Sequence, residues 1–427
     1  MSKQKKYSSL EKYYDDVVSQ TIEECTLCGD CIRNCPLISL APLKDKDPAD
    51  IMEKMIDFLK GGDFSEEVYV KAFACNSCRS CSNSCPQGID VLHAFAAARD
   101  KLVKQGKMPE GVNFVDAIPS MWRTVSALQV KPSERRWLEK VPSQPKRIEN
   151  VVFLGCTLPA APHTVFALLD VIERTGIDFV ALAGGELCCG FPSFAAGKIK
   201  KLEENASQLV ASLKAFSPKR VILPCAGCYR HFTELYPLFL DLDFEVQYYA
   251  QFLNENLEKM NFAKSFRKTA YFHASCMSRS TKANELLGKF LEDIPGLKVV
   301  KAQCTTCCGG TPKLAFPEIP AQLAPVYRES LAKEVIKTGA DYLVNLCQLC
   351  DLTFSTSVGK YPFGVKDVPA LINESMGGKE YKNKWLEYWR CQSDEEIIEK
   401  SRENIEANGL TEEEVRQVLP MILSWKT

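Results

Sequence analysis

Two cysteines stand side by side in the stretch ELCCGFPSF, at Cys188 and Cys189, and a second adjacent pair occurs at Cys307 and Cys308. Consecutive Cα atoms are only about 3.8 Å apart, so a disulfide between neighbours would be strained. Zinc sites usually take paired cysteines from positions two to four residues apart, not from adjacent positions. The adjacent thiols therefore point to another kind of metal or redox chemistry.

Cysteine is the unusual residue of this chain, with 20 cysteines but only four histidines among 427 residues. The first residues, MSKQKKYSSLEKYYDD, contain no apolar segment typical of a secretory signal. No apolar run reaches the roughly 18 residues of a membrane span, so we expect a cytoplasmic protein without a transmembrane helix. Disulfides are rare in that compartment, and the cysteines are therefore predicted to be metal ligands or redox thiols.

The overall charge excludes one class of partner. Lys and Arg number 53 against 54 for Asp and Glu, a formal net charge of −1. This balance provides no electrostatic reason to expect nucleic acid as a partner. The length exceeds that of one typical domain, and a hydrophobic content of 46% is sufficient for packed cores, so we expect several folded domains.

Two cysteine quartets near the N-terminus share the pattern C-x-x-C-x-x-C-x-x-x-C-P. They are Cys25, Cys28, Cys31 and Cys35, and Cys75, Cys78, Cys81 and Cys85. The spacing resembles that of two-cluster bacterial ferredoxins, in which the fourth cysteine of each run ligates the other cluster. The resemblance implies one [4Fe–4S] cubane on the first three cysteines with Cys85, and another on Cys75, Cys78 and Cys81 with Cys35. Zinc is the alternative, although zinc motifs do not need the third close cysteine.

The segment between the quartets, DPADIMEKMIDFLKGG, is predicted to be helical. Its apolar residues recur at helical spacing, Asp50 is the expected N-cap, and two glycines follow its end. Residues 111–148 carry four prolines and many charges, which indicates a linker. The tail is predicted to be helical, with a capping box from Thr411 to Glu414.

Strands and helices alternate in two successive passes after residue 150. Each pass runs in the order strand, cysteine, helix, strand, Cys-Cys-Gly, helix, strand, Cys-x-x-Cys. The expected strands are 151–156, 178–182 and 220–223, then 269–276, 297–300 and 341–347. This alternation favours parallel α/β sheets, in which functional sites collect at the carboxyl ends of the strands. Every cysteine cluster of this half falls at such an end.

The repeated five-cysteine pattern resembles the CCG domain of the heterodisulfide reductase family. The layout is most similar to the reductase type in which the small ferredoxin subunit is fused to the CCG subunit. Iron–sulfur subunits of glycolate, lactate and anaerobic glycerol-3-phosphate dehydrogenases share this layout. The resemblance implies that each repeat binds a noncubane [4Fe–4S] cluster through five cysteines. The implied ligands are Cys156, Cys188, Cys189, Cys225 and Cys228 in the first repeat, and Cys276, Cys307, Cys308, Cys347 and Cys350 in the second.

Several details accompany this assignment. Gly190 and Gly309 follow the adjacent pairs, where a backbone beside a cluster would tolerate little side chain. Zinc in place of iron in one repeat is the alternative. Cys304 and Cys391 remain outside both ligand sets, and we expect Cys304 to be a buried inert thiol or a spare ligand.

The predicted fold is an α-helical ferredoxin domain with two clusters, followed by a duplicated, Rossmann-like α/β pair of CCG domains. We divide the chain into an N-terminal arm (1–24), the ferredoxin domain (25–110), the linker (111–148), a first CCG domain (149–262), a second CCG domain (263–375) and a C-terminal tail (376–427).

The resemblance implies a subunit that passes electrons from two cubanes to two facing noncubane clusters, where a disulfide such as a thiol-coenzyme heterodisulfide is cleaved or formed. His273 is the candidate proton donor, and Arg279 is the candidate anchor for substrate charge. Members of the family often carry a histidine directly after the cysteine of the second repeat, where this chain has Met277. This departure weakens the expectation of heterodisulfide cleavage but not that of cluster binding.

The alternative function is a noncatalytic electron conduit from a flavin dehydrogenase of lactate, glycolate or glycerol-3-phosphate type to a quinone or another acceptor. No G-x-G-x-x-G follows a predicted strand, so neither function has a flavin or nicotinamide site within this chain. We therefore expect a flavoprotein or cytochrome b partner, and a cytoplasmic location that is peripheral to the membrane where the partner is membrane-bound.

Overall fold

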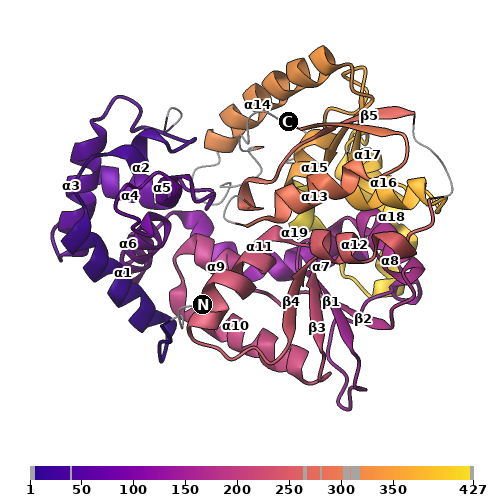
Figure 1. Cartoon of the computed structure of the whole chain (residues 1–427), viewed down its shortest axis with the longest axis horizontal. Helices are drawn as coiled ribbons and strands as arrows, with labels where there is room; N and C mark the ends of the chain where they lie inside the picture. The colour runs from indigo at the N-terminus through magenta and orange to yellow at the C-terminus, as the bar shows by residue number, and fades with distance from the viewer. Residues whose placement is uncertain are drawn as a thin grey trace.

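The computed structural model describes residues 5–38, 41–262, 267–278, 281–301, 308 and 318–423. A small helical domain lies beside a larger α/β body that contains two sheets (Figure 1). Arg279, Cys304, Cys307 and Gly309 are outside the described residues, so the predictions made for them are not tested by the structure.

The N-terminal domain is entirely helical in its described part. Its elements are α1 (Leu10–Glu24), α2 (Asp30–Arg33), α3 (Pro48–Leu59), α4 (Glu66–Phe73), α5 (Ser80–Asn83) and α6 (Val91–Lys104). The helix predicted between the quartets is α3, but its cap is Asp47 and not Asp50. The Asp47 carboxylate accepts hydrogen bonds from the backbone N–H groups of Ala49 and Asp50. Asp47 is the better cap because Pro48, which has no N–H to satisfy, then occupies the first helical position.

Helix α1 occupies most of the segment that the sequence indicates as an N-terminal arm. It buries Leu10, Tyr14 and Val17 on one face. The backbone N–H of Leu10 also donates a 2.8 Å hydrogen bond to the Glu203 carboxylate, which belongs to the α/β body. Helix α1 therefore joins the ferredoxin-like domain to helix α10 (Ile199–Lys214) of the first repeat.

The duplication predicted from the cysteine order is present in the sheets. The first sheet has the strand order β2-β1-β3-β4 and the second has the order β6-β5-β7-β8, and all pairings are parallel. The strands are β1 (Asn150–Gly155), β2 (Phe179–Ala183), β3 (Arg220–Leu223), β4 (Glu245–Tyr248), β5 (Lys268–Phe272), β6 (Leu297–Lys301), β7 (Tyr342–Asn345) and β8 (Gly364–Asp367). Each repeat therefore adds an edge strand, β4 or β8, that the sequence did not reveal.

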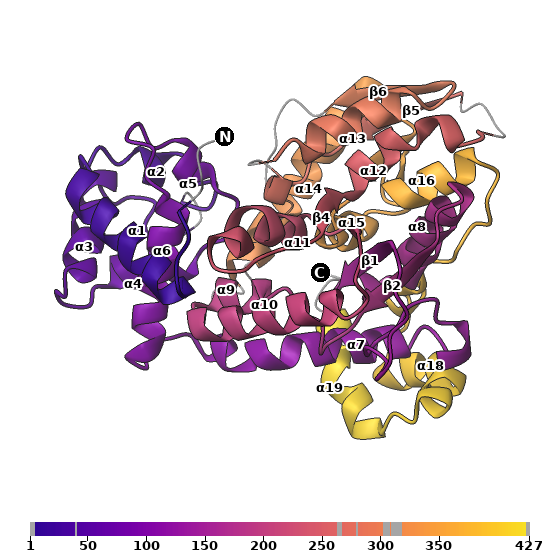
Figure 2. The same cartoon turned by 60° about the horizontal axis from the view of Figure 1, so that its bottom comes forward.

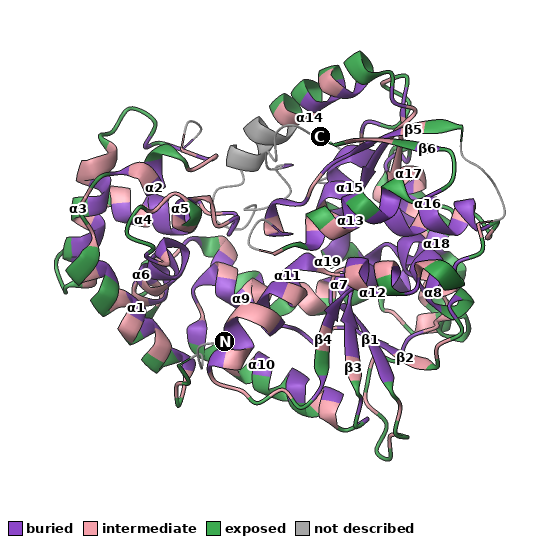
Figure 3. Cartoon of the chain, in the orientation of Figure 1, coloured by how far each residue is buried: buried purple, intermediate pink, exposed green. Residues whose placement is uncertain are grey.

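The central strand β1 is buried along its whole length, as Figure 3 shows. Successive side chains of a strand point to opposite faces. Val151 and Phe153 accordingly join the core shared with the N-terminal domain, whereas Val152 and Leu154 join the core between the two repeats. Because both faces are covered, the strand reads as a continuous apolar run and not as an alternating one.

The two repeats pack against each other through equivalent helices. Helix α8 (Pro162–Arg174) contacts α16 (Val368–Ser375), and α12 (Tyr249–Glu255) contacts α13 (Ala283–Glu292). Helices α8 and α13 follow the first strand of their repeats, and α12 and α16 follow the last. The two contacts are therefore related by exchange of the repeats, and Figure 2 shows the four helices together. This arrangement is an approximate twofold relation within one chain.

The segment predicted to be a linker contains η1 (Glu110–Ala117), α7 (Ile118–Ala127) and η2 (Pro132–Glu134). Pro119 lies in the first turn of α7 and Pro132 begins η2, positions at which the missing N–H has no helical partner to lose. Beyond η2, Leu138 pairs with the edge strand β2, where its N–H donates to the carbonyl of Ala181 at 2.8 Å. Pro119 and Pro132 thus lie where helices begin, and the segment is part of the folded body.

The C-terminal helices α17 (Lys384–Tyr388), α18 (Asp394–Asn408) and α19 (Glu412–Leu423) pack on α7 (Figure 2). The predicted capping box is present, because the Thr411 N–H donates to the Glu414 carboxylate at 2.8 Å and the Glu414 N–H donates to the Thr411 hydroxyl at 3.2 Å. Within the described ranges, none of the helices has the length and apolar character required to cross a membrane.

Replacing Trp385 by Ala is expected to lower the free energy of unfolding by about 3–5 kcal/mol. The Trp385 side chain is fully buried, and its indole N–H donates a 2.7 Å hydrogen bond to the Ala160 carbonyl. Guanidinium unfolding under anaerobic conditions measures the effect. The control is Phe114→Ala, since Phe114 is 58% exposed. Equal midpoints for the two variants would show that the tail is not integral to the fold.

Candidate metal centres

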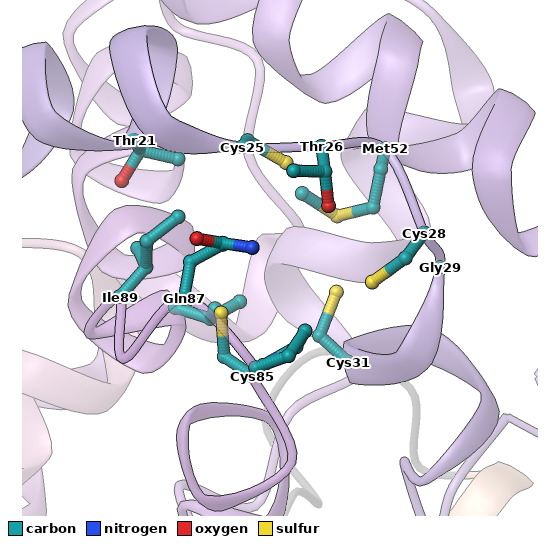
Figure 4. Close-up of a pocket in the computed structure, with 12 residues that line it drawn as sticks. Thr21, Cys25, Thr26, Cys28, Gly29, Cys31, Met52, Cys85, Gln87 and Ile89 are labelled. Carbon is teal, nitrogen blue, oxygen red and sulfur yellow. The ribbon is translucent and has the colours of Figure 1, made fainter.

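The first quartet surrounds a small cavity together with the last cysteine of the second quartet. Cys25, Cys28, Cys31 and Cys85 all line this cavity, and Figure 4 shows their sulfur atoms turned toward one space. Cys28 is exposed and Cys31 is buried. The remaining lining residues carry no formal charge, Met52 and Ile89 among them. The structure thus brings Cys85 to the three cysteines to which the ferredoxin resemblance assigned it.

The second quartet is completed in the same way by Cys35. Cys81 is flanked by Cys75, Cys35 and Cys78, and burial raises its pKa. The Lys71 ammonium, on α4, donates a hydrogen bond to Cys35 Sγ at 3.3 Å. Burial alone would lower the pKa of Lys71, but the cysteine sulfurs around it outweigh that effect and raise it.

The buried positive charge of Lys71 indicates whether the second quartet fits an iron–sulfur cluster. Its side chain is 3% exposed, and a buried ammonium is costly unless a negative group compensates it. Within the described residues, Lys71 forms no ion pair with a carboxylate. Thiolate-ligated four-iron clusters carry net negative charge, so the buried cation beside these sulfurs fits such a group.

The five cysteines of the first repeat converge at the carboxyl ends of β1, β2 and β3. The sulfur atoms of Cys156 and Cys188 lie 4.0 Å apart. Hydrogen bonds from Cys188 and Cys228 lower the pKa of Cys189 to about 6 despite its burial. A hydrogen bond from Cys228 likewise lowers the pKa of Cys225. Two of the five thiols are therefore biased toward the thiolate, which is the form that binds metal.

The backbone of the Cys-Cys pair is held by side chains that sequence reasoning did not identify. The carbonyl of Cys189 accepts hydrogen bonds from Tyr236 Oη at 2.7 Å and from His231 Nδ1 at 3.0 Å. Burial, with the nearby Arg230 charge, lowers the pKa of His231 to about 3, so this ring is neutral. Nδ1 carries its proton, because a carbonyl oxygen only accepts. The signal in the sequence was the run CYRHFTELY directly after the Cys-x-x-Cys motif.

The second repeat brings together Cys308, Cys347 and Cys350 in the described part of the chain. Hydrogen bonds involving Cys308 and Cys347 raise the pKa of Cys350. The hydrogen bond from Cys350 lowers the pKa of Cys347 to about 7, as its counterpart does in the first repeat. Cys276 is buried in the 3-10 turn η7 (Cys276–Ser278) after β5.

Cysteine-bearing elements of the two repeats lie side by side. Cys347 of the second repeat lies close enough to Cys225 of the first to influence its titration. The buried Tyr248, at the end of β4, lies near both sulfurs, and burial raises its pKa. Helix α11 (Ala226–Arg230), which carries Cys228, packs on η7, which carries Cys276. The structure therefore brings cysteine-bearing elements of the two repeats together, whereas the facing of two clusters remains a prediction.

The N-terminal domain contacts this junction through its second quartet. Cys78 and Cys276 form one buried apolar cluster, against which Met277 packs. Arg230 of α11 donates a 2.6 Å hydrogen bond to the Ser77 carbonyl, and Arg79 forms a 3.0 Å ion pair with Glu234. The second quartet is therefore adjacent to the α/β sites, whereas the exposed Cys28 marks the first quartet as the outer one.

The candidate proton donor His273 is at the end of β5 and is 2% exposed. Its ring makes an edge-on contact with Phe354 of α15 (Gln348–Ser355), with ring centroids 4.8 Å apart. Cys391, which has no predicted ligand role, is buried in the core of the tail and donates to the Glu387 carbonyl at 3.4 Å.

Within the described ranges, no three His, Cys, Asp or Glu side chains are grouped as they would be around a single metal ion. In a four-iron cluster each terminal thiolate binds its own iron, so the sulfurs lie farther apart than around one ion. The four cysteine groups could hold iron–sulfur clusters and supply a chain of one-electron carriers.

Known family models match the N-terminal domain and both repeats. The family described as CCG, cysteine-rich domain, matches residues 150–233 and 270–355, and the 4Fe-4S dicluster domain matches residues 21–89. The chain is 28% identical to the D subunit of dihydromethanophenazine:CoB–CoM heterodisulfide reductase of Methanosarcina mazei, covering 83% of this chain and 94% of that protein. It is 27% identical to lactate utilization protein A 1 of Bacillus mycoides over 52% of this chain and 96% of that protein.

A solved structure, of a hypothetical protein from Helicobacter pylori, matches the fold with a TM-score of 0.50 at 12% identity, covering 88% of this chain and 77% of that one. Fold and cysteine sites together define a CCG-domain iron–sulfur protein with an N-terminal ferredoxin domain. The chain belongs to this family, and it is similar to the heterodisulfide reductase D subunits from Methanosarcina over 83% of its length.

Replacing Gly190 by Ala is expected to destabilise the first repeat by about 1–3 kcal/mol through overpacking, in addition to the cost of its backbone conformation. Gly190 has φ +78°, and a Cβ there would lie 2.6 Å from Leu202 Cδ1 and 3.2 Å from the Leu202 carbonyl oxygen. Helix α10 (Ile199–Lys214) therefore fills the space beside Gly190, where the sequence led us to expect a cluster.

Gly176→Ala is the matched control, since Gly176 has φ +75° but no atom within 4 Å of the new Cβ. Denaturant unfolding and iron analysis of both variants measure the difference. Equal stability of the two variants would contradict the contact with Leu202.

Proposed function

We propose that this chain is the iron–sulfur subunit of a heterodisulfide reductase-like complex, and that it passes electrons through two cubanes to two noncubane clusters that cleave or form a disulfide. The observation that carries this proposal is the contact between helix α11, which carries Cys228, and turn η7, which carries Cys276 of the other repeat. Cluster sites that meet at this contact would provide a place where one disulfide can reach both. The sequence similarity to the heterodisulfide reductase of Methanosarcina mazei, which extends over most of both chains, supports the same function.

The order of the sites supports an inward path for electrons. The first quartet includes the exposed Cys28, where a redox partner has access. The second quartet contacts Cys276 of the second repeat through Cys78. Electrons received at the outer quartet would therefore reach the facing sites through the inner one.

Cleavage of a disulfide consumes two electrons and two protons and yields two thiols. Noncubane clusters, when bound, would supply the electrons singly and an iron open to sulfur. The protein must deliver the protons, and His273 is the proposed donor because its strand, β5, leads directly into the turn that carries Cys276. Arg279, which follows that turn in the sequence, is the proposed anchor for anionic substrate groups.

Met277 favours a second candidate function, that of a noncatalytic conduit between a flavin dehydrogenase and a quinone or another acceptor. Its apolar side chain packs against Cys78 and Cys276 at the position where a histidine is expected for disulfide chemistry. The similarity to a lactate utilization protein agrees with this alternative. In the conduit, zinc could replace iron in one repeat without loss of the electron path.

The proposed partners are subunits that bring a flavin or a haem, because the sequence has no recognisable motif for a flavin or a nicotinamide. A flavoprotein or a cytochrome b would donate or accept electrons at the first quartet, and the complex would be cytoplasmic, or peripheral to a membrane through that partner. A small thiol or disulfide would be the substrate of the reductase.

Protein purified without oxygen is expected to contain about 16 irons per chain, four for each of four clusters, with an equal amount of sulfide. Iron, zinc and sulfide analysis measures this, and electron paramagnetic resonance (EPR) spectroscopy distinguishes the cubanes from the noncubane centres. A content near eight irons with added zinc would remove the facing-cluster mechanism.

The intact complex is expected to oxidise a reduced viologen dye when given the CoB–CoM heterodisulfide. His273→Asn should lower this turnover by about 10²–10⁴-fold at unchanged iron content, because a positioned proton donor contributes roughly that factor. Cys391→Ala is the control and should retain turnover. Absence of turnover in a complex with all its iron, together with dye reduction by a flavin dehydrogenase, would favour the conduit.

A further inference from the structure

Lys71 is the one lysine that is fully buried in the described part of the chain. Its ammonium contacts Cys35 Sγ at 3.3 Å on one side and lies 4.7 Å from the centre of the Phe95 ring on the other. No Asp or Glu of the described residues pairs with it. Its positive charge is therefore directed at the cysteines of the second quartet and is shielded from solvent.

Arg99 adds a second buried cation at the same site. Its side chain is 1% exposed and its guanidinium lies near Cys75. Its hydrogen bonds go to the carbonyls of Ala72 and Phe194, at 2.6 Å and 3.1 Å. Because these partners are neutral carbonyls and not carboxylates, they do not compensate the charge of Arg99.

The first quartet has no cation in contact with its sulfurs among the residues that line its cavity, all of which are uncharged. The charge of Lys71 also acts on Cys31, but the hydrogen bond of its ammonium goes to Cys35 of the second quartet. Arg33, the nearest cation along the chain, is 52% exposed and is paired with Asp30 at 2.9 Å. Solvent and the carboxylate together screen this arginine, so its field at the first quartet is weak. The two quartets have the same cysteine spacing but different electrostatic surroundings.

Local charge and hydrogen bonds to sulfur are among the factors that set the reduction potential of an iron–sulfur cluster. Reduction adds one negative charge, which a buried cation at hydrogen-bond distance from a ligand sulfur stabilises. We propose that Lys71, assisted by Arg99, holds the reduction potential of the inner cubane above that of the outer one.

This inference deepens the proposed function, on whose cluster assignment it rests. The step moves one electron, which leaves the outer cubane and oxidises it, and enters the inner cubane and reduces it. The redox partner, a flavoprotein or cytochrome, supplies the electron at the outer end. Lys71 thus makes the transfer favourable toward the quartet that contacts Cys276, and electrons are held next to the facing sites.

The test is a redox titration of the full-length, anaerobically purified chain, followed by EPR. Lys71→Met removes the charge at similar volume, and Lys71→Arg keeps the charge. Lys54→Met is the matched control, because Lys54 is in the same domain but is 36% exposed and paired with Asp50 and Glu67. Cys28→Ser changes the signal of the outer cubane and so identifies which signal belongs to which quartet.

In wild-type protein the inner cubane is expected to be reduced first. At the midpoint potential of the wild-type inner cubane, Lys71→Met should lower the ratio of reduced to oxidised inner cubane at least about tenfold. This corresponds to a downward shift of its midpoint potential by about 59 mV for one electron. The outer cubane should shift less than the inner one, because Lys71 makes its hydrogen bond to Cys35 and not to a cysteine of the first quartet, and Lys54→Met should shift neither. An unchanged inner potential in a Lys71→Met protein with all its iron would overturn the proposal.

The proposal can still be tested if Lys71→Met loses its iron. The two cubanes are then titrated in wild-type protein and in Lys71→Arg. An inner cubane that is reduced after the outer one in these proteins overturns the proposal. Failure of the proposed function is recognised separately. A chain with about eight irons and no noncubane signal would contradict that function, yet both of its cubanes could still be titrated.

Discussion

The apolar contact between the two repeats is the constraint on which the other sites depend. Val152 of the first sheet and Phe272 and Val344 of the second belong to one continuous core, which the helix pairs α8–α16 and α12–α13 close from either side. Because parallel strands end at a common edge, this core also sets where the cysteines of each repeat point. The same packing places helix α11, which carries Cys228, against turn η7, which carries Cys276.

The ferredoxin-like domain is oriented by a few polar contacts made in an apolar setting. Arg230, which follows Cys228 on the same short helix, reaches the backbone of Ser77, and Arg79 pairs with Glu234. Both contacts connect the loop of the second quartet to the helical segment that begins directly after Cys225. Such interactions contribute less to stability than apolar burial does, because desolvation offsets much of their attraction. Their directionality instead specifies one docking arrangement, which places Cys78 against Cys276.

The protein also creates distinct electrostatic surroundings for cysteine motifs that look the same in sequence. In each repeat, hydrogen bonds within the Cys-x-x-Cys motif lower the pKa of its first thiol. The second quartet lies beside buried cations, whereas the first opens to solvent through Cys28. Similar spacing therefore does not mean similar redox behaviour. Side chains from other elements set the difference, α4 and α6 in the case of the second quartet.

The sequence by itself determined the family, the duplication and the grouping of most cysteines, because ligand spacing and the alternation of strands and helices are local properties. It also located the Thr411 capping box, which depends only on residues three positions apart. It did not reveal that residues 111–148 and the tail form one folded unit around Trp122 and Trp385, since two of the prolines that indicate a linker also lie where helices begin. The edge strands β4 and β8, the His231 and Tyr236 contacts to Cys189, and the position of Lys71 were decided by tertiary structure alone. Each depends on segments distant in the chain meeting in space, and burial, which gives a lysine or a histidine its chemical character, exists only after they have met.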